Sequence, residues 1–158
     1  MKMSAGVEWA VHCCVVLSQA DGPVPAQRLA DFHGVSRTYL AKHLQQLSRA
    51  GLVRSTEGRV GGYALTRSAE EISVLDVVLA IEGREPAFRC TEIRQNGPLP
   101  ATGEVCRRPC GIARAMYAAE DAWRASLAAV SVADLATGVE EDTGAQTFVR
   151  LRGWLATG

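Results

Sequence analysis

The sequence predicts a mainly α-helical fold with one small β-hairpin, and three observations support this prediction. Two stretches with apolar residues at helical spacing are joined by a short turn at Gly34. Two short apolar runs then flank the glycine-rich segment 57–62, which is typical of a hairpin. A long helical pattern begins later, at Gly111. Helix, turn, helix and hairpin in this order make a winged helix-turn-helix, here followed by a long extra helix.

The first three helices have recognisable ends. The first is expected from Ser4, as its cap, to about Ser18, because apolar residues recur between them at helical spacing. Pro25 suits the first turn of the second helix, where a missing N–H costs nothing. The third helix is expected to begin at its cap Ser36 and to end at Gly51.

The hairpin and the fourth helix follow directly. Strands are expected at 52–55 and 63–66, with the turn between them forming the wing. The fourth helix begins at Ser73 in the capping pattern Ser-x-x-Asp and ends at Gly83. The segment 84–110 is rich in proline and glycine, which predicts a long loop, and a loop of that length usually marks function or disorder.

The helix that begins at Gly111 is expected to reach about Val130 and to need a partner surface. A second copy of the chain is the simplest partner, which predicts a two-fold homodimer. Two shorter helical stretches, 132–136 and 146–155, fit either that interface or the winged helix. The expected domains are 1–83 for the winged helix-turn-helix, 84–110 for the loop, and 111–158 for the dimerisation helix and the C-terminal helices.

Positive charge is concentrated in one part of a neutral chain. The whole chain has 17 basic and 17 acidic residues, but the segment 28–67 holds seven Lys and Arg against two acidic residues. A local basic surface is the electrostatic footprint of nucleic-acid binding, because phosphates need cations where the duplex lies. An ordinary solvated face is the alternative.

The N-terminal segment and the cysteines indicate the compartment. Glu8 and His12 interrupt the N-terminal apolar residues, so this segment is not a signal peptide, and no apolar run approaches the roughly 20 residues of a membrane span. We therefore expect a cytoplasmic protein without a membrane partner. Thiols stay reduced there, so the five cysteines are metal ligands or core residues rather than disulfides.

The third helix supplies the candidate DNA contacts. If it enters the major groove, its first turns face base edges and phosphates. The candidates are Ser36, Arg37, Thr38, Tyr39 and Lys42, of which Lys42 suits a phosphate. Tyr39 is alternatively a core aromatic. Arg59, at the tip of the hairpin, is placed to enter a minor groove, with plain surface decoration as the alternative.

Cys90, Cys106 and Cys110 all lie in the loop segment. Their spacing is weak evidence for zinc, because only the last two have the form of a zinc knuckle. Thiolate-ligated iron–sulfur clusters accept wider spacing and other side chains. A metal-free thiol–disulfide switch of Cys106 and Cys110 stays open. An enzyme or an adaptor is disfavoured, because the sequence contains no nucleophile–base pair, phosphate loop or paired catalytic carboxylates.

Four sequence blocks resemble the Rrf-two family of bacterial regulators, and the resemblance extends over most of the chain from residue 4 to about 130. The blocks are Ser36-x-x-Tyr39-Leu40, Leu47-x-x-Ala50-Gly51-Leu52-Val53, Gly58-x-x-Gly61-Gly62-Tyr63-x-Leu65 and Glu71-Ile72-x-x-Leu75-Asp76-Val77-Val78. The family includes the IscR, NsrR and RsrR types, and the resemblance is nearest to the RsrR type. It implies a homodimeric repressor that binds double-stranded operator DNA and carries an iron–sulfur cluster in the loop after the fourth helix.

The resemblance also implies a set of cluster ligands. The IscR type uses a histidine three residues after the last cysteine, and this chain has Ala113 there, which excludes that carry-over. The NsrR type uses an N-terminal carboxylate of the other subunit, which Glu8 matches, and His12 shares its helix face. The RsrR type implies a two-iron cluster (2Fe-2S) held by Cys90 and Cys110 of one subunit and Glu8 and His12 of the other, with Cys106 spare or an alternative ligand.

Other assignments stay open for these residues. Glu8 is alternatively a solvated carboxylate and His12 a core histidine, while Cys13 and Cys14 are expected in the core. A four-iron cluster (4Fe-4S) held by the three loop cysteines and Glu8, in a sensor of nitric oxide or of cluster supply, is the nearest rival.

Trp9 and His33 are the candidates for coupling the cluster to DNA binding. Trp9 lies between Glu8 and His12 on the first helix, and a large ring cannot shift without moving its neighbours. His33, at the end of the second helix, can report the same movement nearer the DNA. Trp9 is alternatively a plain interface aromatic.

Overall fold

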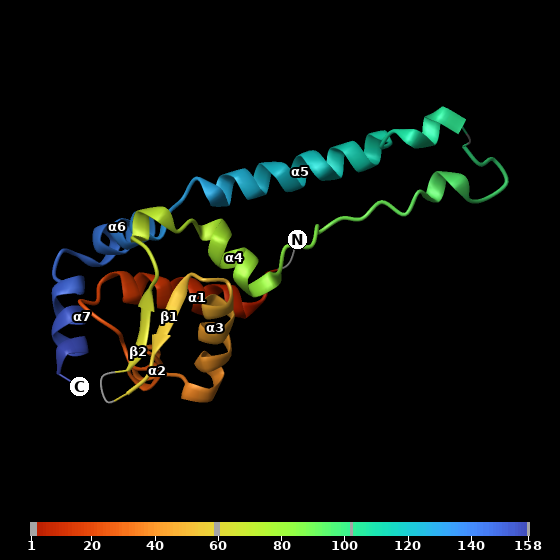
Figure 1. Cartoon of the computed structure of the whole chain (residues 1–158). Helices are drawn as coiled ribbons and strands as arrows, with labels where there is room; N and C mark the ends of the chain where they lie inside the picture. Colours follow the sequence, from red (N-terminus) through yellow and green to blue (C-terminus); the bar gives the residue numbers. More distant parts are fainter. Residues whose placement is uncertain (1–2, 59–60, 102, 158) are drawn as a thin grey trace. The chain divides into compact units, whose positions relative to one another are not determined.

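The computed structural model describes residues 3–58, 61–101 and 103–157 (Figure 1). The chain forms two compact units, which we call the winged-helix unit, Lys2–Arg84 with Leu127–Gly158, and the cysteine unit, Glu85–Ser126. Within the described residues, no helix is both long enough and apolar enough to cross a bilayer.

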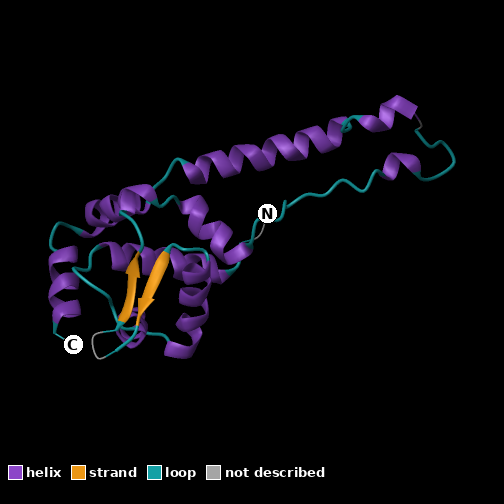
Figure 2. Cartoon of the chain, in the orientation of Figure 1, coloured by secondary structure: helices purple, strands orange, loops and turns teal. Residues whose placement is uncertain are grey.

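The elements confirm the predicted mainly helical winged fold (Figure 2). In the winged-helix unit they are α1 (Ala5–Ser18), α2 (Ala26–His33), α3 (Arg37–Arg49), β1 (Val53–Thr56), β2 (Gly62–Leu65), the 3-10 turn η1 (Ala69–Glu71), α4 (Val74–Glu82), α6 (Val132–Thr143) and α7 (Thr147–Ala156). The cysteine unit holds the 3-10 turns η2 (Ile93–Gln95) and η3 (Gly103–Arg107) and nearly all of α5 (Gly111–Ala128).

Local side-chain chemistry sets several helix ends. The Ser36 hydroxyl accepts a hydrogen bond from the backbone N–H of Tyr39 at 3.2 Å, which caps α3. Ser73 and Asp76 form the predicted capping box at the start of α4. Ser4 stands at the cap position of α1 but does not cap it, because its hydroxyl donates to the Glu82 carboxylate at 2.6 Å. The start of α1 is thereby tied to the end of α4.

The hairpin is antiparallel, with Val53 opposite Leu65, and each strand lies within one residue of its predicted position. A third segment pairs with β2. Tyr63 exchanges two backbone hydrogen bonds of 2.8 Å with Val24, just before α2. This pairing brings the backbones close together, and a Cβ built on Gly62 would lie 2.4 Å from the carbonyl carbon and oxygen of Val24. No residue with a side chain therefore fits at position 62 unless the Val24 backbone moves.

One apolar core joins the helices of the winged-helix unit. Leu29 of α2 and Leu40 of α3 are fully buried in one cluster with residues of α1, where Cys13 and Cys14 are also buried, as predicted. Burial raises the pKa of each of these two thiols to about 12. Such thiols stay protonated, which suits core residues rather than metal ligands.

The C-terminal helices pack on the winged helix. Phe148 and Leu151 of α7 are buried in the same core as α1. The Arg28 guanidinium of α2 lies 4.0 Å from the centre of the Trp154 ring and donates to the Trp154 carbonyl. The two C-terminal helices therefore complete the core around the helix-turn-helix.

Replacing Gly62 with alanine is expected to lower the free energy of unfolding by about 3 kcal/mol. The new methyl group meets backbone atoms that cannot move aside without breaking the bridge between Val24 and Tyr63. Chemical denaturation measures the change. Gly153→Ala in α7 is the matched control, because a Cβ there meets none of the described atoms within 4 Å, and it should stabilise by about 0.5–1 kcal/mol. Equal stabilities of the two variants would contradict this account.

Candidate functional site

The first two turns of α3 present the predicted DNA-contacting residues to solvent. Ser36, Arg37, Thr38, Tyr39 and Lys42 are all exposed. Tyr39 is intermediate between its two predicted roles, since its side chain is 43% exposed and its ring also lies 6.0 Å from the ring centre of Trp9. Arg59, predicted at the tip of the wing, lies outside the described residues. The N-terminal end of α3 is therefore exposed to solvent, where a binding partner can reach it.

A buried histidine of α3, His43, was missed by sequence reasoning, and its ring contacts the Tyr39 ring edge to face, with ring centres 5.3 Å apart. The Nδ1 atom of His43 lies 3.3 Å from Gln46 Oε1, and the Gln46 amide donates to the carbonyl of Ile81 in α4 at 3.2 Å. The apolar spacing of α3 counts His43 as polar and gives no signal of this contact. The pair fixes α3 against α4 and so supports the exposed N-terminal end.

An aromatic path connects α1 with α3 through α2. The ring of His33 lies 6.0 Å from that of His12 and 5.8 Å from that of Trp9, and Trp9 in turn contacts Tyr39 edge to face. Burial, and secondly the nearby His12 ring, lower the pKa of His33, so its neutral form is favoured. The structure therefore brings together four of the predicted residues. His12 and Glu8 are both exposed on α1, so His12 is not the core histidine of the alternative prediction.

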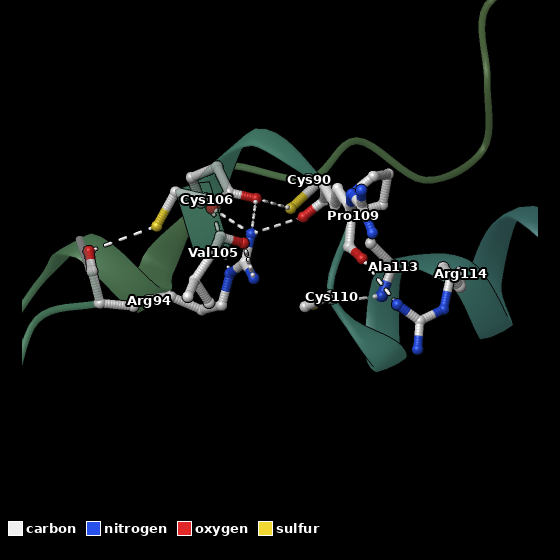
Figure 3. Close-up of polar contacts among 11 residues, drawn as sticks. Cys90, Arg94, Val105, Cys106, Pro109, Cys110, Ala113 and Arg114 are labelled. Carbon is white, nitrogen blue, oxygen red and sulfur yellow. Dashed lines mark hydrogen bonds and ion pairs between the residues drawn. The ribbon is translucent and has the colours of Figure 1, made fainter. Parts of the chain in front are cut away.

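The three loop cysteines are half-buried in the cysteine unit, and each has a different partner (Figure 3). The Cys90 thiol donates to the Glu92 carboxylate at 3.4 Å, and the Cys106 thiol donates to the Ala101 carbonyl at 3.2 Å. The sulfur of Cys110 accepts from the backbone N–H of Ala113 at 3.4 Å, in the first turn of α5.

Cys110 is set apart by its electrostatic environment. Hydrogen bonding from the backbone N–H of Ala113, then from that of Ile112, and the positive charge of Arg94 lower the pKa of its thiol. Backbone N–H groups at the start of a helix stabilise negative charge on a ligand or side chain. These contacts therefore stabilise the thiolate form of Cys110 relative to an ordinary thiol.

Arg94 is the residue of this segment that sequence reasoning missed. Its guanidinium pairs with the Glu92 carboxylate at 2.7 Å and donates to the carbonyls of Val105 at 3.1 Å and Arg108 at 3.0 Å (Figure 3). The sequence gives a weak signal, a pair of opposite charges two residues apart between the cysteines. The other partners of Arg94 are backbone carbonyls, which every residue has, so the sequence does not reveal them.

The donor set fits an iron–sulfur cluster by its chemistry, but one unit does not hold a complete set. Soft thiolates are the ligands that such clusters use, and the pKa of the Cys110 thiol is lowered by the backbone N–H of Ala113. Among the residues that the structure describes, no three His, Cys, Asp or Glu side chains are grouped closely enough to hold a metal ion. The predicted ligands Cys90 and Cys110 belong to the cysteine unit, and Glu8 and His12 to the winged-helix unit.

Comparison with known proteins places the chain among transcriptional regulators. Residues 3–138 match the family model of Rrf2, the Rrf-two group of the sequence resemblance, described as "Iron-dependent Transcriptional regulator". A protein of Lactococcus lactis named YffB is 35% identical over 138 residues, which are 86% of this chain and 87% of that protein. The regulator IscR of Pectobacterium carotovorum is 40% identical over 92 residues, and the match spans 57% of this chain and 56% of that protein.

Solved structures agree with this assignment. IscR of T. potens is 25% identical and covers 95% of this chain and 96% of its own, with a TM-score of 0.65. CymR of B. subtilis, at 24% identity, covers 87% of this chain and 98% of its own with a TM-score of 0.67, which shows the shared fold. Since the family model matches well over half of the chain, the chain belongs to the Rrf2 family of transcriptional regulators.

Proposed function

We propose that this chain is a homodimeric repressor whose grip on operator DNA depends on the redox state of a two-iron iron–sulfur cluster. The observation that carries the proposal is the three-thiol segment that leads directly into α5, where the sulfur of its last thiol, Cys110, accepts a hydrogen bond from the backbone N–H of Ala113. The family description as iron-dependent regulators supports the same reading.

The DNA-binding half of the proposal rests on α3. A helix whose first turns are exposed and carry hydroxyl and cationic side chains suits the major groove, where such groups meet base edges and phosphates. The proposed contacts are Ser36, Arg37, Thr38, Tyr39 and Lys42, together with Arg59 of the wing.

The dimer is proposed from the surface of α5. Ile112 and Met116 lie one helical turn apart on α5, and both side chains are exposed. Exposed large apolar side chains on adjacent turns indicate a protein partner. A second copy of the chain supplies the same side chains, so two α5 helices bury each other in a two-fold interface.

The dimer also completes the proposed ligand set. Cys90 and Cys110 would hold the cluster with Glu8 of the partner subunit and His12 of the partner subunit, and Cys106 is the spare or alternative ligand. Such a cluster supplies one-electron redox chemistry, and its imidazole ligand raises the reduction potential relative to four thiolates.

The coupling to DNA follows the aromatic path. His12 contacts His33, His33 contacts Trp9, and Trp9 contacts Tyr39 at the DNA-facing end of α3. A displacement of His12 is transmitted along this path, because packed rings cannot move independently. We therefore propose Trp9 and His33 as the residues that connect the cluster to α3.

Purification without oxygen tests the proposal. We expect a coloured protein with iron and acid-labile sulfide in equal amounts, two of each per chain, and a gel shift of its own promoter region that differs between oxidised and reduced samples. Mössbauer spectra count the irons and distinguish a four-iron cluster. A colourless, iron-free protein that binds the promoter equally under all redox conditions would overturn the sensor while leaving DNA binding intact. Iron-free binding that responds to thiol oxidation would indicate the switch of Cys106 and Cys110.

A further inference from the structure

One arginine ties together the two arms of the cysteine segment. Arg94 donates through Nη1 to the Val105 carbonyl, 11 residues away, and through Nη2 to the Arg108 carbonyl, 14 residues away. The same guanidinium holds both oxygens of Glu92 at 2.7–2.8 Å. It therefore connects the arm that carries Cys90 with the arm that carries Cys106 and Cys110, as Figure 3 shows.

Glu92 is held in an uncommon backbone conformation. Its φ is 53°, in the left-handed region, where the other described residues with positive φ are all glycines. A non-glycine residue keeps this conformation when its surroundings fix it, and such positions cluster at functional sites. Here the Glu92 side chain is fixed from both sides, by the Cys90 thiol and by Arg94.

The ion pair of Arg94 and Glu92 is less exposed than the nearby ion pair of Arg107 and Glu104. The side chains of Arg94 and Glu92 are 22% and 31% exposed, whereas those of Arg107 and Glu104 are 77% and 88% exposed. Ion pairs open to solvent contribute little to structure, because water and salt screen them. A partly buried guanidinium that is also bonded to two carbonyls is far more directional. Of these two ion pairs, only that of Arg94 and Glu92 can hold the backbone of the segment in a fixed arrangement.

We propose that Arg94 and Glu92 form a clasp that positions Cys90 relative to Cys106 and Cys110 before any metal binds. This inference deepens the proposed function, since these thiols are its proposed cluster ligands. Arg94 is a positioning residue that acts through the backbone of the opposite arm. It also keeps a positive charge beside thiols that become negative when they ligate a cluster.

The clasp is tested first on reduced, iron-free protein, so that the result does not depend on a cluster. Arg94→Ala should label with iodoacetamide about ten-fold faster than the unchanged chain at Cys90 and Cys106, because the loss of charge-assisted hydrogen bonds lets the segment open. Mass spectrometry of the peptides gives the rate at each cysteine. Arg107→Ala, in the same segment but with an exposed ion pair, is the matched control and should leave both rates unchanged.

Two further variants separate positioning from general damage. Cys13 and Cys14 are buried in the winged-helix unit, so their continued protection reports an intact fold. If Arg94→Ala exposes them, Glu92→Gln replaces it as the milder break of the same pair and should accelerate labelling of Cys90. Arg94→Lys keeps the charge but not the fork of donors, and it should restore the labelling rates only in part.

A loaded sample gives a second, independent readout. Arg94→Ala should lower the reduction potential of the cluster, while Arg94→Lys should keep it close to that of the unchanged chain, because the potential follows the charge. Labelling rates in Arg94→Ala that equal those of Arg107→Ala would overturn the clasp. A wild-type protein without iron would refute the proposed function, and the labelling rates would still decide the clasp.

Discussion

Replacing Cys110 with serine is expected to abolish iron binding and the redox dependence of DNA binding. The Cys110 sulfur stands at the first turn of α5, where the backbone N–H of Ala113 stabilises its thiolate. A serine hydroxyl stays protonated at neutral pH and is a poor ligand for iron in a thiolate cluster. Iron and sulfide content, the visible spectrum and a gel shift under both redox conditions measure the loss.

The neighbouring cysteine provides the matched control for this variant. The Cys106 thiol donates a hydrogen bond to the Ala101 carbonyl, and Cys106 lies four residues before Cys110 in the sequence. Under the proposed ligand set, Cys106→Ser should retain iron and the redox response. If Cys106→Ser loses iron to the same extent as Cys110→Ser, the ligand set contains all three loop cysteines, and the four-iron alternative replaces the two-iron cluster.

Helix ends are the part of the fold that the sequence predicts best, because their chemistry is local. Ser36 caps α3 and Ser73 caps α4 through atoms three residues away, and Gly34 ends α2 in the left-handed conformation. Ser4 shows the limit of this reasoning. Its hydroxyl turns to Glu82, 78 residues along the chain, and a local pattern cannot reveal such a partner.

The candidate site divides in the same way. The three thiols are visible in the sequence, whereas the role of Arg94 depends on carbonyl oxygens 11 and 14 residues away, to which residue type gives no clue. The site also contains Glu92, whose left-handed backbone departs from what its side chain favours. Local propensity fails at such positions because contacts over a longer range decide them.

The basic segment shows how a charge count can overestimate a binding surface. Of its seven cations, Arg28 packs on Trp154, and Arg49 and Arg67 line a hollow of about 450 Å³ together with Arg84. These side chains do not share the exposed first turns of α3. The total charge of the segment therefore predicts the class of partner better than it predicts the residues that touch it.

The double replacement Arg37→Ala with Lys42→Ala is expected to weaken operator binding by about 100-fold or more. Each lost contact from a cation to a base edge or phosphate costs about 1–3 kcal/mol, and the two side chains lie on separate turns, so their losses should add approximately. If both contact phosphates, the slope of log affinity against log salt should fall by about 2. Fluorescence anisotropy at several salt concentrations measures both quantities.

Arg49→Ala is the control that gives this experiment its meaning. Arg49 is an exposed arginine of the same helix, but it lies in the last turn, about 18 Å along the axis from Arg37. The Arg49→Ala substitution removes one positive charge from α3, as each of the other two substitutions does. A general electrostatic effect would therefore weaken DNA binding in Arg49→Ala as well. A specific contact predicts that affinity changes less than about two-fold in Arg49→Ala, since a distant charge is screened within about 10 Å at moderate salt. Equal losses at both ends of α3 would show that the whole helix surface, rather than its N-terminal end, faces the DNA.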